Sequence, residues 1–455
     1  MDTLKKKYGF WTAVAMVVGI VIGSGVFFKA PDVLERSGGN LLLSLLAWIV
    51  GAFAMIFGAL VFAEVANRIE KVNGIVDYTE EAYGKLAGYM MGWFKGLLYY
   101  FPLTAVLGWV SSMYTVLLIY GNTRSADEIV NSIEHWLIAV VYITVAFIIN
   151  FIGPKLAGFI QVSTTVIKLI PLVLIAIVGT FYGLINGVVV ENFVEAGKSF
   201  SNSIGSFTTA VVATAFAYEG WIVATTINDE IIDSKKNLPK ALALGTIIVF
   251  IVYVIYFIGI ASILPTSTII AEGHGAVSIA ANILFGKFGG TILTIFVIIS
   301  CLGTLNGLAI ASIRTPYSLA VRGQGPFPKF LSKVNKRTNM PLGSVMYGLV
   351  FALTFLLVWC GSFEGWWNGK FIDISELPIV LIYFAYMFIY IWVMVTFKNL
   401  GFVKRFIFPT FALIGSFIIV YGGLSKESAV IDVTISVVGM LIGIFFYRKN
   451  NVEEI

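Results

Sequence analysis

The stretch VIGSGVFFK, residues 21–29, interrupts an apolar segment that otherwise runs from Tyr8 to Phe28. An apolar segment of this length is typical of a helix that crosses a bilayer. Glycine weakens the middle of a helix, and a break there frees backbone amides and carbonyls from their helical partners. Two interpretations follow: either Gly19 and Gly23 form a G-x-x-x-G pair at which two helices pack closely, or the helix is unwound at this point.

The composition indicates an all-α, polytopic membrane protein. Of 455 residues, 58% are hydrophobic and only 12% are charged, and the mean hydropathy is +0.92, far above that of soluble chains. Apolar segments of membrane-spanning length recur along the chain with short polar connections. We expect twelve transmembrane helices, centred near Val18, Ala52, Leu107, Tyr142, Val173, Thr214, Val252, Phe296, Phe351, Ile382, Ile414 and Val437.

The basic residues predict how the chain is oriented. They gather at residues 5–7 and in the loops around 235–240, 329–337 and 398–405, whereas the opposite loops hold few, Lys29 among them. Because loops rich in Lys and Arg stay in the cytoplasm, we expect a multi-pass protein of the cell membrane with both termini cytoplasmic. These charges are spread over thin loops without a contiguous basic face, so no nucleic-acid partner is expected.

The sixth span, residues 205–232, is interrupted by the sequence Ala217-Tyr218-Glu219-Gly220. A carboxylate inside a membrane is costly unless it faces a cavity or a partner. The two interrupted spans are five spans apart, and transporters built from inverted repeats place a broken helix at the same position in each repeat. We therefore expect a single transmembrane domain, 1–455, with two inverted five-helix repeats, 8–184 and 205–398, followed by helices 11 and 12 in 405–447.

A broken helix offers groups for a zwitterion. The freed amides at the start of the second half-helix lie at a positive dipole end that attracts a carboxylate, and the carbonyls that end the first half-helix accept from an ammonium. Glycine and serine leave space for the substrate backbone. This chemistry suits an α-amino acid. We expect a substrate site of Val21, Ile22, Ser24, Gly25, Val26, Phe216, Ala217 and Glu219.

Three motifs together resemble the amino acid-polyamine-organocation superfamily: GSGVF at 23–27, FAYEGW at 216–221 and NDEIIDSKKNLPKAL at 228–242. The last two are most similar to the L-type amino acid transporter branch and its bacterial relatives, exchangers of the alanine-serine-cysteine or serine-threonine type. The resemblance implies a leucine-transporter-like fold and sodium-independent exchange of small neutral L-amino acids by alternating access. It also implies that Ser24 and Gly25 contact the substrate carboxylate and that Phe216 is the outer gate.

One departure from that branch concerns partners. Eukaryotic light chains carry a cysteine between spans three and four that links them to a heavy chain, whereas the corresponding loop here, 121–135, has none. No covalent heavy chain is expected; the expected partners are the amino acid substrate and the lipid bilayer.

Two ionisable residues lie deep in predicted spans. Lys168 lies in the fifth span, where an unpaired ammonium is costly; it either snorkels to an interface or, as the resemblance implies, reaches the unwound part of span one and replaces a coupling cation. Glu219 accepts structural hydrogen bonds, binds a proton or favours cationic substrates. A proton-coupled symporter and a transporter of cationic amino acids or polyamines therefore remain alternatives.

Membrane enzymes and channels fit the sequence poorly. The two histidines, His135 and His274, stand alone at predicted loop edges, so no catalytic residues, metal site or cofactor are expected. No segment resembles a repeated selectivity filter, and paired broken helices favour an occluded site over a continuous pore.

Overall fold

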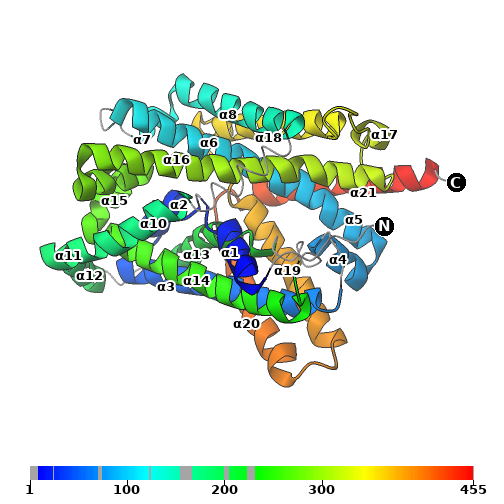
Figure 1. The fold of residues 1–455 in the computed structure, drawn as a ribbon, viewed down its shortest axis with the longest axis horizontal. Coiled ribbons are helices and arrows are strands. Elements are labelled where there is room, and N and C mark those ends of the chain that lie inside the picture. Colours follow the sequence, from blue (N-terminus) through cyan, green and yellow to red (C-terminus); the bar gives the residue numbers. More distant parts are fainter. Residues whose placement is uncertain are drawn as a thin grey trace. The chain divides into compact units, whose positions relative to one another are not determined.

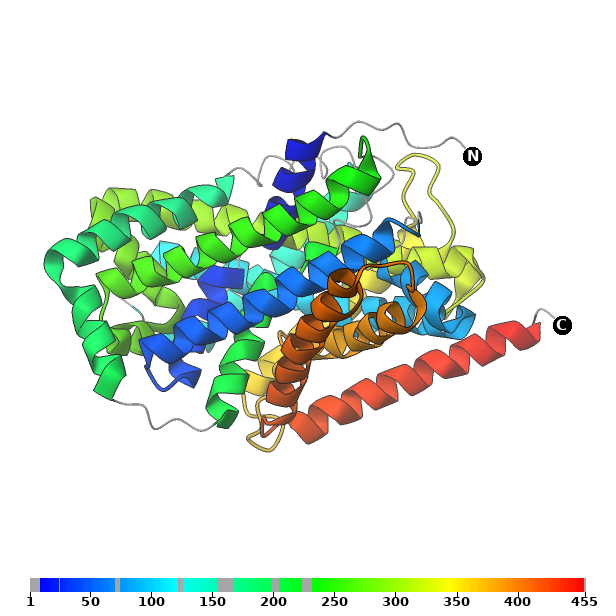
Figure 2. The ribbon, with the colours of Figure 1, turned by 90° about the horizontal axis from the view of Figure 1, so that it is seen from below.

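The fold is helical throughout the part of the chain that the computed structural model describes (Figures 1 and 2). The structure describes residues 9–23, 25–69, 74–121, 124, 126–153, 167–198, 204–222 and 231–453. These residues contain no β-strand and gather into two compact units. Each unit draws segments from both halves of the sequence.

The first unit comprises Met1–Tyr78, Lys168–Phe296 and Ile379–Lys426. Its helices are α1 (Phe10–Val21), α2 (Gly25–Arg36), α3 (Leu41–Ala66), α10 (Leu169–Leu174), η3 (Ile175–Gly179), α11 (Thr180–Asn186), α12 (Val188–Lys198), α13 (Ile204–Tyr218), α14 (Ser234–Ile263), α15 (Thr266–Glu272), η5 (Gly273–Gly275), the first part of α16 (Ala276–Val321), nearly all of α19 (Leu377–Thr396), η6 (Val403–Ile407) and α20 (Phe408–Leu424). Helix α4 (Ile75–Tyr83) begins here and ends in the second unit.

The second unit comprises Thr79–Ile167, Val297–Pro378 and Glu427–Ile455. Its helices are α5 (Lys85–Phe94), η1 (Lys95–Tyr100), α6 (Phe101–Tyr120), α7 (Ala126–Val130), α8 (Ile133–Ile152), the remainder of α16, α17 (Pro328–Leu331), α18 (Leu342–Phe363) and α21 (Ala429–Glu453). Helices α6, α8 and α18 pack on one another, and α21 lies along α5 (Figure 1).

Helix α14 organises the first unit by packing against α3, α1 and the η3–α11 segment; Figure 2 shows α3 and α14 side by side. Glycines allow the closest of these contacts. A Cβ on Gly179 would lie 2.8 Å from the Gly259 carbonyl oxygen, and one on Gly183 would lie 2.3 Å from the Ser262 carbonyl oxygen. The two backbones therefore approach each other closely at the glycines, as is common where membrane helices associate.

Ten helices of the described chain are long and apolar enough to cross a membrane. The two expected spans missing from these ten are the first and the sixth. Helices α1 and α2 have 12 residues each and α13 has 15, shorter than a bilayer requires. The helices that are too short to span a bilayer are thus those of the two spans that the sequence predicts to be broken. The ten long apolar helices make the chain a multi-pass membrane protein.

Candidate functional site

The break in the first span lies between α1 and α2, as the sequence predicts. Helix α1 ends at Val21, and Ile22 leaves the helix with extended backbone angles (φ −69°, ψ 104°). Helix α2 begins at Gly25; Ser24 lies outside the described residues. The final helical bond of α1 runs from the Ile22 amide to the Val18 carbonyl, 2.8 Å away. The carbonyls of residues 19–21 thus follow the last regular acceptor of the helix.

Side chains from two other helices donate to these carbonyls. The Lys168 ammonium donates to the Gly19 carbonyl, and the Tyr253 hydroxyl donates to the Val21 carbonyl at 3.1 Å. Lys168 stands directly before α10 and is 3% exposed, so its charge is inside the first unit. Lys168 thus contacts a carbonyl near the end of α1, just before the break, and its role in place of a coupling cation stays a prediction.

The break in the sixth span follows Tyr218, where α13 ends. Glu219 and Gly220 form a turn in which Gly220 has φ +109°, a conformation that side chains other than glycine rarely adopt. Glu219 is buried, and its Oε1 accepts a hydrogen bond from the Tyr386 hydroxyl of α19 at 2.9 Å. A partner for this carboxylate is thus part of the fold, as its depth requires.

The two breaks touch. A Cβ built on Gly25 would lie 2.8 Å from the Ala217 Cα, and both residues are buried. From the sequence, we expect glycine at this position because a larger side chain would fill the space of the substrate backbone. The structure provides another reason, because α2 and α13 approach so closely here that even a methyl group would press on the Ala217 backbone.

Phe216 belongs to a buried group that the sequence did not predict. Its ring packs edge-on against Phe28 with centroids 5.6 Å apart, and the His274 ring stacks on Phe28 at 4.9 Å. The Lys29 ammonium lies over both rings, 4.6 Å from the Phe28 centroid and 5.4 Å from that of Phe216, and pairs with Asp32 at 3.0 Å. We call these five residues the Phe216 cluster.

The Phe216 cluster corrects two expectations about position. Lys29 does not lie in a loop: it is inside α2 and only 1% exposed. His274 does not stand alone, because it stacks on Phe28. Counting basic residues to orient the chain assigns every lysine between two spans to a loop. The one signal in the sequence that Lys29 is buried is its position directly after the apolar run Val26-Phe27-Phe28.

The chemistry that the site offers is recognition rather than bond making. Among the described residues, no group of three or more His, Cys, Asp or Glu side chains is placed to hold a metal ion. The groups found at the two breaks are backbone carbonyls, the start of helix α2, one ammonium and one carboxylate. Spanning helices broken at a shared buried site define a class of membrane protein, the transporters built on discontinuous helices.

Comparison with known proteins agrees with this class. The amino acid permease family matches residues 8–447. A serine/threonine exchanger of Bacillus subtilis is 31% identical over 424 residues, which cover 91% of this chain and 90% of that protein. The human cystine/glutamate transporter is 27% identical over 387 residues, which cover 84% of this chain and 74% of that protein. The human large neutral amino acids transporter small subunit 2 is 27% identical over 361 residues, which cover 78% of this chain and 64% of that protein.

The chain belongs to the amino acid permease family. The superfamily resemblance inferred from the three motifs is confirmed, and the similarity to a bacterial exchanger and to a large neutral amino acids transporter supports the L-type branch. The chain is accordingly a membrane transporter of amino acids and not an enzyme.

Proposed function

We propose that the protein exchanges small neutral L-amino acids across the cell membrane by alternating access, without sodium. The observation that carries the proposal is the contact between the two helix breaks at Gly25 and Ala217, because it brings the start of α2 and the end of α13 to one buried place. The related serine/threonine exchanger supports small neutral substrates.

The substrate is proposed to lie beside the Gly25–Ala217 contact, against the end of α1 and the start of α2. Its carboxylate would accept from amides at the start of α2, those of Ser24, Gly25 and Val26, where the helix dipole favours negative charge. Its ammonium would donate to the Ile22 carbonyl and to carbonyls of Phe216 and Ala217. The Val21 carbonyl already accepts from Tyr253, but a carbonyl oxygen has two lone pairs and can accept a second donor.

Lys168 is proposed to make a coupling cation unnecessary. Carbonyls at a helix break commonly coordinate sodium in coupled transporters. Here the Gly19 carbonyl accepts from an ammonium that belongs to the chain itself, which supplies a positive charge without a bound ion. Transport would then need no sodium gradient, and exchange of one amino acid for another would drive the cycle.

Phe216 is proposed to gate the site on its outer side. Its ring lies at the break in α13 and is held from α2 by Phe28 and the Lys29 ammonium. Opening the gate would require the Phe216 ring to leave the cation above it, and a cation over an aromatic ring in a desolvated place contributes up to about 2 kcal/mol. The closed gate is therefore stabilised by a contact that thermal motion can break.

The inverted-repeat architecture is part of the proposal. We count twelve spans by joining α1 with α2 and by including the span that begins with α13. Spans one and six, two and seven, and five and ten then fall in the first unit, and spans four and nine fall in the second. Span eight is divided, with its second half in the same unit as span three, and the first two residues of α19 also fall in the second unit. This pairing of spans supports two five-helix repeats, with helices 11 and 12 following them.

Counter-flow in proteoliposomes tests the function. Vesicles loaded with unlabelled serine, alanine or threonine should accelerate the uptake of labelled serine, equally well when choline replaces sodium. Vesicles loaded with arginine or putrescine should not. Uptake that requires a sodium gradient, or that is indifferent to internal amino acid, would refute exchange. Uptake driven by an imposed proton gradient alone would support the symporter alternative.

A further inference from the structure

A basic segment of the second unit, residues 322–337, combines cations with exposed aromatic rings. It contains five basic residues and no acidic one, in the sequence RGQGPFPKFLSKVNKR. Arg322 pairs with Glu80 at 3.4 Å, whereas Lys329 and Lys333 are exposed. Phe327 is 70% exposed and Phe330 is 53% exposed. Basic residues beside exposed aromatic rings are typical of a protein surface that meets a bilayer.

The backbone holds Phe327 outward at a conformational cost. Phe327 has φ +50° and ψ +49°, the left-handed region that bulky side chains rarely adopt. Its carbonyl accepts from the amides of Phe330 and Leu331, at 3.0 Å each, and so starts the single turn of α17. A strained residue whose ring is mostly outside the protein gains little from packing within the chain. The ring is placed for a contact with something beyond it.

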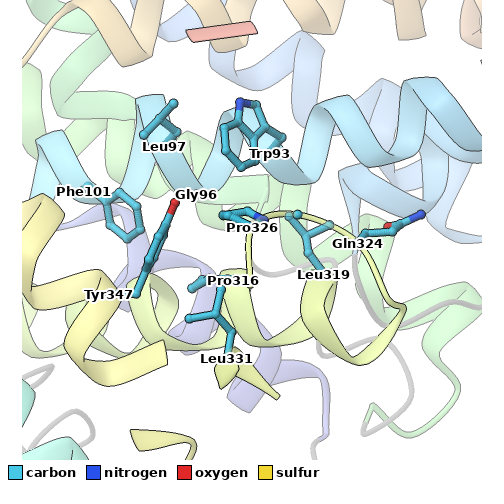
Figure 3. Close-up of a pocket in the computed structure, with 11 residues that line it drawn as sticks. Trp93, Gly96, Leu97, Phe101, Pro316, Leu319, Gln324, Pro326, Leu331 and Tyr347 are labelled. Carbon is cyan, nitrogen blue, oxygen red and sulfur yellow. The ribbon is translucent and has the colours of Figure 1, made fainter. Parts of the chain in front are cut away.

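An apolar pocket lies directly beneath this turn, entirely within the second unit (Figure 3). Its enclosed space is small, about 20 Å³, so it can take only the tip of an apolar chain. Figure 3 shows its side chains coming from η1 and its flanks, from the end of α16, from the basic segment and from α18. The lining residues are Trp93, Gly96, Leu97, Phe101, Pro316, Leu319, Gln324, Gly325, Pro326, Leu331 and Tyr347.

The pocket offers an apolar ligand little competition from polar groups. The Trp93 indole nitrogen donates to the Gly439 carbonyl at 2.8 Å, so its polar atom is already used by α21. The wall next to it includes η1, a π-helical turn, and π-helical turns are frequent at functional sites. Leu331 lines the pocket while Lys329, two residues earlier, is exposed. One helical turn thus joins an apolar cavity to a cationic surface.

We propose that the basic segment and this pocket bind an anionic phospholipid, with its phosphate on Lys329 and Lys333 and the end of one acyl chain in the pocket. Opposite charge favours this ligand over a zwitterionic lipid, in which a cationic headgroup offsets the phosphate, and the apolar cavity favours it over free phosphate, which leaves the pocket empty. In the orientation expected from the distribution of basic residues, the segment faces the cytoplasmic leaflet, where anionic lipids attract juxtamembrane cations. The site is separate from the proposed exchange function and does not depend on it.

Native mass spectrometry of the purified full-length protein, titrated with phosphatidylglycerol or phosphatidylcholine, tests the headgroup half. The unmodified protein should retain phosphatidylglycerol preferentially. The double variant Lys329→Ala/Lys333→Ala should lose roughly thirtyfold in affinity for it. The matched control is Lys236→Ala/Lys240→Ala, which removes two exposed lysines, also four residues apart, from α14. Equal retention of both lipids, or an equal loss in the control, would overturn the proposal.

Two further measurements separate the acyl chain from the phosphate. Gly96→Leu adds a side chain in the pocket wall, and its Cβ has room because the nearest heavy atom, the Thr315 Cγ2, lies 3.5 Å away. Retention of phosphatidylglycerol should fall in this variant while its melting temperature stays unchanged, and unaltered retention would exclude the pocket. Inorganic phosphate should not displace the lipid; displacement at equal concentration would show a phosphate site in place of a lipid site.

Discussion

The two helix breaks meet at Gly25 and Ala217 but are stabilised in opposite ways. At the first break, donors from other helices reach backbone acceptors: Lys168 to the Gly19 carbonyl and Tyr253 to that of Val21. At the second break, the break itself supplies the acceptor, the Glu219 carboxylate, and α19 supplies the donor, the Tyr386 hydroxyl. The first break carries no charge of its own, whereas the second brings one.

This difference shows how a membrane protein keeps an unwound segment intact without water. Carbonyls left by a helix end need donors, and a buried carboxylate needs them more. At the first break the carbonyls receive a charged donor, the Lys168 ammonium, and at the second break the Glu219 carboxylate receives a neutral one, the Tyr386 hydroxyl. Removing these supports one at a time should therefore affect transport and stability to different extents.

Lys168→Ala should have the largest effect on transport. A hydrogen bond from a charged donor contributes about 1.5–3 kcal/mol, so exchange should fall by about tenfold or more while the protein still folds. Lys168→Arg should not restore it, because a planar guanidinium is too large to replace a compact ammonium. Exchange kinetics measured from both sides of reconstituted vesicles check this prediction.

Lys95→Ala is the matched control for that experiment. Lys95 is another buried lysine, but its ammonium lies 5.0 Å from the ring of Tyr100 rather than at a helix break. Exchange should persist in this control. If Lys168→Ala transports as well as Lys95→Ala, the ammonium has no part in transport.

Gly25→Ala should destabilise the contact between the breaks. The added methyl group would lie 2.8 Å from the Ala217 Cα, and overpacking of this kind costs about 1–3 kcal/mol. We expect a lower melting temperature together with weaker substrate binding, and Gly25→Val should be worse. Gly401→Ala is the control, because no heavy atom lies within 4 Å of its Cβ position. Equal melting temperatures in the two variants would mean that the breaks do not touch.

Tyr386→Phe should have an intermediate effect, because it withdraws the donor from a buried carboxylate. The expected loss of stability is about 2 kcal/mol. Glu219→Gln should be milder, since an amide oxygen still accepts from the Tyr386 hydroxyl. Stability is followed by thermal melting and transport by counter-flow. Abolished transport in Glu219→Gln with normal melting would assign the carboxylate to proton coupling.

Tyr253→Phe should have the smallest effect of the four. It removes a neutral hydrogen bond from the Val21 carbonyl, worth about 0.5–1.5 kcal/mol, and leaves the Lys168 contact in place. A modest rise in the substrate concentration for half-maximal exchange is expected, with little change in maximal rate. A loss as large as that of Lys168→Ala would show that the hydroxyl, and not the charge, supports the first break.

The sequence predicts both breaks because their residues conflict with a spanning helix. GSG removes side chains from the middle of an apolar segment, and Glu219 places a carboxylate where none is tolerated alone. Lys168 is predictable for the same reason: its depth demands a partner, and freed carbonyls are the nearest acceptors. A residue that is unfavourable inside an apolar span can be recognised from the sequence alone, without knowledge of the fold.

Hydrogen-bond partners that are ordinary residues of an apolar span cannot be identified from the sequence. Tyr253 and Tyr386 stand in apolar segments like many other core tyrosines, and only the packing of α14 and α19 shows which carbonyl or carboxylate they reach. Lys29 is misplaced in a loop because a charge count uses charge as the sign of exposure, whereas the Asp32 carboxylate and the Phe28 ring allow it to be buried. Gly25 fits both interpretations of the opening stretch equally.

The backbone contact between α14 and the η3–α11 segment has a consequence for the first break. Tyr253 belongs to α14, and Lys168 stands at the start of the helix that runs through α10 and η3 into α11. Gly179 and Gly183 bring the backbone of this helix directly against Gly259 and Ser262 of α14. The two donors therefore belong to one closely packed, rigid assembly. Any displacement of α1 large enough to break one hydrogen bond strains the other, so the carbonyls of the break are released together, and the transition should be all-or-none rather than graded.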